Sequence, residues 1–175
     1  MADVHHDIDP MTVLDDLATG CPSGRAILPD WHELYAAFCG HIGDTADAHP
    51  VTRCARALAE LRARVQPDSS SQHYEAARLA FIRAVDDWAQ AQAPFMAGCD
   101  DSPGAAVDRM AAAHLEAVAL LRNDGDEQTV HAAWHALGTR ANEWTDLVNE
   151  VVYGQRRNAQ GPMAMRSGPF DSDQK

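Results

Sequence analysis

Three side chains with metal-binding chemistry stand four residues apart in the C-terminal half of the chain: Glu127, His131 and His135. An α-helix places positions i and i+4 on one face, so the two histidines could share a divalent transition metal. A further ligand is needed, and His114 of the preceding predicted helix is a candidate for it. This set would form the centre of a metal-dependent enzyme, which is one alternative function for the chain.

The same four residues also have a structural interpretation, which the rest of the sequence favours. The chain contains neither an H-E-x-x-H motif nor the paired E-x-x-H motifs of di-iron bundles, so the ligand set is incomplete. Glu127, His131 and His135 lie beside the apolar seam of their helix, where side chains usually meet solvent. His114 falls within an apolar face and is expected to be a core histidine bonded to a carbonyl or carboxylate. We therefore expect no catalytic residue and no cofactor.

A second group of charged residues is predicted where the last two helices meet. If these helices are antiparallel, Asp108 and Arg109 near the start of one lie beside Asp146 and Glu150 near the end of the other, and Arg109 could meet either of those two carboxylates. A charge-assisted hydrogen bond between them would fix the register of the helices. Together with Arg156 and Arg157, Arg109 could instead bind a small anion, which is a second alternative function.

Apolar residues recur every three or four positions in five segments, which predicts five α-helices. The longest covers 125–157, is expected to be capped by Asp124 with Glu127, and is expected to end at Gly154. Its apolar seam, with two tryptophans, predicts the centre of the core: Val130, Trp134, Leu137, Ala141, Trp144, Val148 and Val151. Three of the other four begin at capping residues or first-turn prolines: Asp30, His49-Pro50 and Ser102-Pro103. The fourth begins at about Gln72, after the candidate N-caps of 68–71.

Short connections between these segments favour neighbouring antiparallel helices. The sequence therefore predicts an all-α protein, an antiparallel bundle of about five helices with disordered N- and C-terminal tails. We expect a disordered acidic arm over 1–25, the bundle domain over 26–155 and a disordered tail over 156–175.

Composition excludes several classes of partner. The net charge of -12 opposes binding to nucleic acid or to an anionic membrane surface. Neither a signal peptide nor an apolar run of membrane-spanning length is recognised, so a cytoplasmic location is expected. The four cysteines form no C-x-x-C pair and are expected to be reduced thiols.

Several short motifs occur in a fixed order along the chain: Leu28-Pro29, His49-Pro50, Ala59-Glu60-Leu61, Asp87-Trp88, Val107-Asp108-Arg109, Asp146-Leu147-Val148 and Gly154-x-Arg156-Arg157. In these motifs the chain resembles an actinobacterial family, the domain of unknown function 4254. The resemblance covers about 28–157. It implies an all-helical bacterial cytoplasmic domain and implies no reaction.

The favoured hypothesis is a protein–protein interaction or assembly module without catalytic activity. The third predicted helix carries a wide apolar arc, because Leu79 and Ile82 flank its main stripe. A wide arc favours a second neighbour, so we expect a protein partner or self-association as a homo-oligomer.

Overall fold

The computed structural model describes residues 28–64, 71–92, 102–123 and 125–159, with side chains described up to Tyr153. These ranges contain five α-helices and no strand: α2 (Trp31–Phe38), α3 (Pro50–Ala63), α4 (Ser71–Gln92), α5 (Pro103–Arg122) and α6 (Glu127–Ala159). The predicted all-α class is confirmed. The arm over 1–25 and residues 160–175 of the predicted tail lie outside the described residues.

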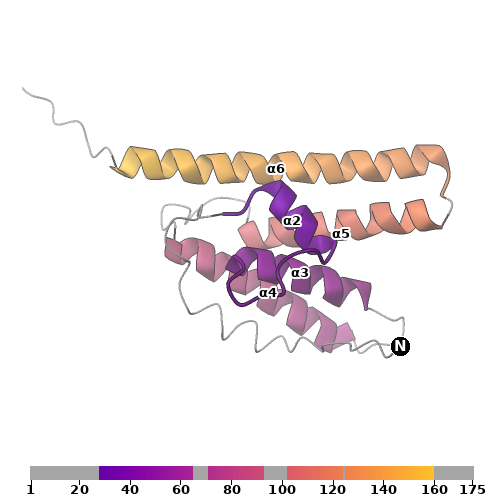
Figure 1. The fold of residues 1–175 in the computed structure, drawn as a ribbon, viewed down its shortest axis with the longest axis horizontal. Coiled ribbons are helices and arrows are strands. Elements are labelled where there is room, and N and C mark those ends of the chain that lie inside the picture. Colours follow the sequence, from indigo (N-terminus) through magenta and orange to yellow (C-terminus); the bar gives the residue numbers. More distant parts are fainter. Residues whose placement is uncertain (1–27, 65–70, 93–101, 124, 160–175) are drawn as a thin grey trace, which may run out of the picture.

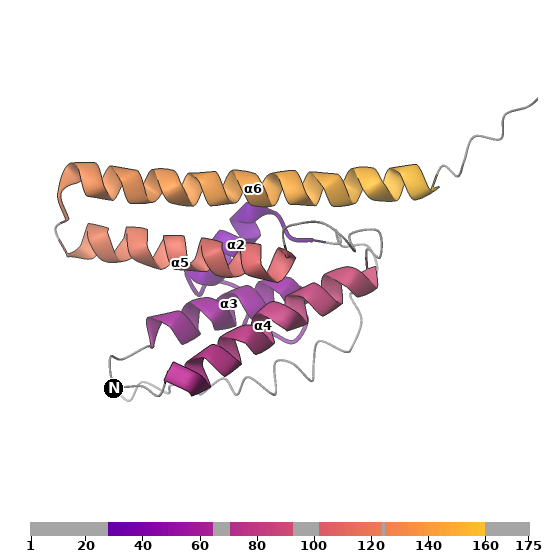
Figure 2. The same ribbon diagram turned by 180° about the vertical axis from the view of Figure 1, so that it is seen from behind.

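The helix α5 lies at the centre of the arrangement. It pairs with α6 as an antiparallel hairpin on one side, and α3 and α4 pack on its other side (Figure 1). Seen from behind, the long helix α6 runs along the outside of the molecule, next to α5 and the short α2 (Figure 2). No helix in the described ranges has both the length and the apolarity that a membrane span requires.

Side chains cap the helices where the sequence indicated. The Asp30 carboxylate accepts a hydrogen bond from the backbone N–H of Glu33 at 2.9 Å, which begins α2. The His49 ring nitrogen Nδ1 accepts from the N–H of Val51 at 3.2 Å, and the Ser102 hydroxyl accepts from Ala105 at 3.1 Å. Each bond satisfies a backbone donor that has no partner within its helix.

Both predicted ends of the long helix were wrong. Asp126, not Asp124, caps α6, because its carboxylate accepts hydrogen bonds from the backbone and hydroxyl of Thr129. The helix also continues past Gly154 to Ala159, four residues into the predicted tail. A single glycine weakens a helix by only about 1 kcal/mol and ends it only where the chain turns into the left-handed conformation.

The predicted seam of α6 forms much of the core that the structure describes. Trp144 is 1% exposed, and its indole N–H donates to the carbonyl oxygen of Pro29 at 2.9 Å. This bond joins the segment before α2 to the middle of α6, across more than a hundred residues of sequence. Leu137, Ala141 and Val151 are also buried.

The helices α4 and α5 approach most closely at Gly104. A Cβ atom on this residue would lie 2.1 Å from the carbonyl oxygen of Ile82, so no larger residue fits without a shift of backbone. Asp86 of α4 accepts hydrogen bonds from the N–H of Gly104 at 2.7 Å and from the hydroxyl of Ser102. The contact fixes where the first turn of α5 crosses α4.

We expect Gly104→Ala to lower the free energy of unfolding by about 2 kcal/mol, because backbone must move to admit the methyl group. Chemical denaturation measures this change. Gly138→Ala in α6 is the matched control: no atom lies within 4 Å of its added Cβ, so the same substitution should stabilise that helix by about 1 kcal/mol. Equal effects of the two substitutions would contradict the close approach.

Candidate functional site

The structure does not bring the four predicted metal ligands together. Glu127, His131 and His135 are exposed on α6, whereas His114 is only 4% exposed within the bundle. Among the described residues, no group of three or more histidine, cysteine, aspartate and glutamate side chains is arranged to hold a metal ion. The metal-centre hypothesis therefore gains no support from the geometry.

His114 belongs to α5, and its side chain faces α2. Its ring contacts Tyr35 edge-on, with the ring centroids 5.2 Å apart, and Phe38 at 5.8 Å. Its Nδ1 atom is buried without a hydrogen-bond partner, in contrast to the predicted bond to a carbonyl or carboxylate. Burial lowers the pKa of His114 below its ordinary value, and the positive charge of Arg122 lowers it further. His114 is thus a core histidine that stays neutral at pH 7.

The predicted charged group is only partly within the described residues. Asp146 and Glu150 are exposed on α6, Arg109 is half-buried on α5, and the side chains of Arg156 and Arg157 lie outside the described residues. Asp108, the neighbour of Arg109 and a member of the same predicted group, forms buried ion pairs with two other arginines.

Asp108 joins three helices through its carboxylate, which is 3% exposed. Arg62 of α3 binds it with two hydrogen bonds, of 2.9 and 2.8 Å. Arg78 of α4 donates two more to one oxygen, at 3.0 and 2.7 Å, and also pairs with Glu75. Burial raises the pKa of Asp108, but the hydrogen bonds and charges of the two arginines lower it by more, so it lies below its usual value. The two carboxylates, Asp108 and Glu75, and the two arginines compensate one another's charges, so these residues form a structural ion-pair cluster.

One signal in the sequence could have located this cluster. Gly104, Val107, Asp108 and Ala111 share one face of α5, and the other three are small or apolar. A carboxylate in a buried face must be paired, because an isolated buried charge is very costly. Arg62 and Arg78 were not recognised, because the partner of a buried charge depends on how the helices pack.

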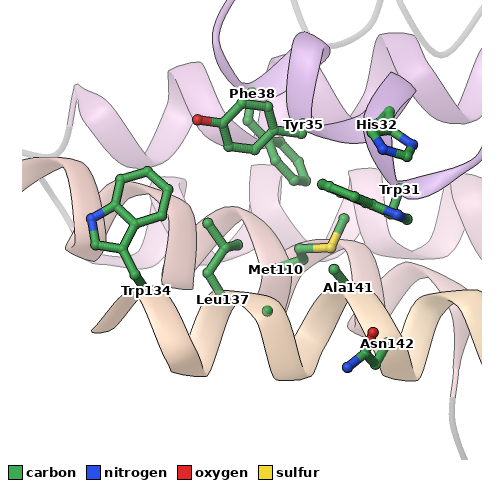
Figure 3. A pocket seen from close by; sticks show the side chains of 10 residues that line it. Trp31, His32, Tyr35, Phe38, Met110, Trp134, Leu137, Ala141 and Asn142 are labelled. Atoms are coloured by element: carbon green, nitrogen blue, oxygen red, sulfur yellow. The ribbon is translucent and has the colours of Figure 1, made fainter. Parts of the chain in front are cut away.

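An open apolar cleft lies between α2 and α6, with α5 as its floor (Figure 3). Its volume is about 570 Å³. Trp134 and Trp31 stand on opposite sides of it, with Leu137 and Met110 between them. The complete lining is Trp31, His32, Tyr35, Phe38, Met110, Trp134, Leu137, Gly138, Ala141 and Asn142.

The sequence analysis did not predict this cleft. Trp31, Trp134 and Leu137 were recognised only as core residues of two separate helices. Trp31 is in fact 36% exposed and stacks on the ring of His32, with 3.7 Å between the ring centroids. Periodicity identifies an apolar face but does not show whether a neighbouring helix covers it completely.

Thiol chemistry is also poorly supported among the described residues. Cys54 is buried, and burial raises its pKa to about 12, against a smaller opposing effect of the Arg53 charge. A thiol with this pKa stays protonated at pH 7 and is a weak nucleophile. Neither of the described cysteines, Cys39 and Cys54, forms a disulfide bond.

Comparison with known proteins adds no identification: no family model, no curated protein and no solved structure matches the chain. The resemblance to the domain of unknown function 4254 therefore stays a prediction. The apolar cleft is the feature of the described structure with the geometry of a binding site.

We expect Asp108→Ala to lower the free energy of unfolding by about 3 kcal/mol, because it leaves Arg62 and Arg78 without their buried partner. Urea denaturation measures this loss. Arg78→Ala should cost less, because Arg62 keeps both of its hydrogen bonds to Asp108. A larger loss from the arginine substitution would rule out this ranking.

The pKa of His114 predicts that stability falls in mild acid. Below its ordinary value of 6.5, the unfolded chain binds a proton on this histidine that the folded protein does not bind. The free energy of unfolding should decrease as the pH falls from 6.5, and His114→Leu should remove part of that decrease. Thermal unfolding between pH 7.5 and 5 tests this, with His135→Leu at an exposed position as the control. Identical pH dependence in the two variants would exclude His114 as the source.

Proposed function

We propose that this domain is a non-catalytic binding module that captures a compact apolar group in the cleft between α2 and α6. One observation carries the proposal: the folded chain leaves an aromatic-lined cleft of about 570 Å³ open at its surface. Pockets that bind small molecules typically enclose ~300–1,000 Å³ and are lined mainly by apolar and aromatic side chains.

The open cleft lowers the stability of the fold, which supports this proposal. Trp31 stands 36% exposed at its edge, although burial of an indole would stabilise the fold. Each apolar wall also lacks the packing contacts that a close-packed interior would supply. A bound apolar group would restore those contacts and remove the wall from water.

An interaction with another protein fits within this proposal, because a partner's side chain can supply the apolar group. Self-association through α4 stays a prediction. Leu79 is 42% exposed on that helix, which agrees with the wide apolar arc expected there. Single exposed apolar side chains are common on protein surfaces, so Leu79 does not by itself indicate an interface.

Binding of the neutral apolar dye N-phenyl-1-naphthylamine, followed by its fluorescence, tests the proposal. We expect saturable binding that Gly138→Leu weakens by about tenfold or more, because the new side chain projects into the cleft. Ala136→Leu adds the same side chain at an exposed position outside the lining and should leave binding unchanged.

Circular dichroism spectra of both variants show whether they remain folded. Dye binding that is absent from the unsubstituted protein, or that is equal in the two leucine variants, would refute the cleft as the binding site.

A further inference from the structure

The lining of the cleft carries no aspartate, glutamate, lysine or arginine. A charged ligand group would lose its hydration on entering and would find no opposite charge on the walls. The polar side-chain groups of the lining are the imidazole of His32, the amide of Asn142, the indole N–H groups of Trp31 and Trp134, and the hydroxyl of Tyr35, which hydrogen-bonds to Cys39. These can hydrogen-bond to a neutral polar group, since the amide both donates and accepts.

The walls favour a ring over a flexible chain. Trp31, Tyr35, Phe38 and Trp134 offer ring faces and edges, and aromatic groups pack on these in stacked or edge-to-face geometry. The thioether of Met110, between the two tryptophans in Figure 3, adds a polarisable contact to a ring. A flexible chain would lose more conformational entropy on binding to the same walls.

The cleft is also short. Its lining on α6 runs from Trp134 to Asn142, a rise of about 12 Å along the helix. Trp31 and Trp134 stand on its opposite sides in Figure 3, which favours a compact molecule over an extended chain that continues past both.

Gly138 keeps part of the cleft empty. This residue lies inside α6, where glycine is a poor helix former, and no atom lies within 4 Å of the position a Cβ would take. Because Gly138 lines the cleft, alanine or another good helix former would strengthen the helix and occupy space that a ligand could fill.

From these observations we propose that the cleft binds an uncharged small molecule built on a ring system, with a neutral hydrogen-bonding group. This inference rests on the proposed function and specifies its ligand. It distinguishes the ligand from anionic metabolites and from alkyl chains.

Titration followed by the tryptophan indole N–H signals in NMR spectra tests this selectivity. The probes are 2-naphthol, 2-naphthoate with the same rings and a negative charge, and decan-1-ol as a neutral chain. We expect 2-naphthol to bind most tightly, with 2-naphthoate weaker by about tenfold or more. The signals of Trp31 and Trp134, assigned with Trp31→Phe and Trp134→Phe, should shift, whereas those of buried Trp88 and Trp144 should not.

Gly138→Ala separates a binding role from a structural one. We expect it to raise the melting temperature and to weaken 2-naphthol binding by about tenfold, because its methyl group enters the cleft. Ala136→Leu, outside the lining, should leave binding unchanged.

Two results would overturn the ligand class: equal affinity for 2-naphthol and 2-naphthoate, or tighter binding of decan-1-ol. Unchanged 2-naphthol binding in Gly138→Ala would overturn the role of the glycine. These failures differ from failure of the proposed function, in which N-phenyl-1-naphthylamine itself does not bind in the cleft.

Discussion

The burial of one carboxylate constrains the whole bundle. Asp108 is almost inaccessible to water, so it can remain charged only while Arg62 and Arg78 donate to it. These arginines come from α3 and α4, which therefore have to meet α5 at a fixed height and rotation. The close approach at Gly104 applies a second, steric constraint to the same end of α5.

The two sides of α5 differ in how closely they are packed. Toward α3 and α4, a glycine contact and a four-charge cluster hold the helices tightly. Toward α2 and α6, the same helix presents Met110 to an open cleft and His114 to the rings of Tyr35 and Phe38. A rigid side thus supports a side with unfilled apolar space, as a binding site on a stable scaffold requires.

The features that reduce stability are concentrated at and beside this cleft. Gly138 weakens α6, Trp31 is left partly in water, and His114 is buried with an unsatisfied ring nitrogen next to two lining residues. Departures from the most stable choice tend to gather at functional sites, because binding needs space and exposed groups that folding alone would remove. This clustering is the physical basis for the proposed binding role.

Local signals in the sequence were enough to predict the all-α class and most of the helices. Apolar spacing, capping residues and first-turn prolines act within a few residues, so Asp30, His49 and Ser102 could be recognised as helix starts without knowledge of the fold. The ends of α6 were misjudged because competing aspartates and a tolerated glycine differ in energy by only about 1 kcal/mol.

The charged residues that meet, and the position of the open cleft, depend on how the helices pack. Asp108 pairs with Arg62 and Arg78, which the sequence did not predict. The predicted metal ligands are separated because His114 is turned into the core while His131 and His135 face solvent. The cleft likewise depends on how far α2 covers α6. These outcomes arise from contacts between residues distant in sequence, whose geometry depends on all the packed helices together and not on local periodicity.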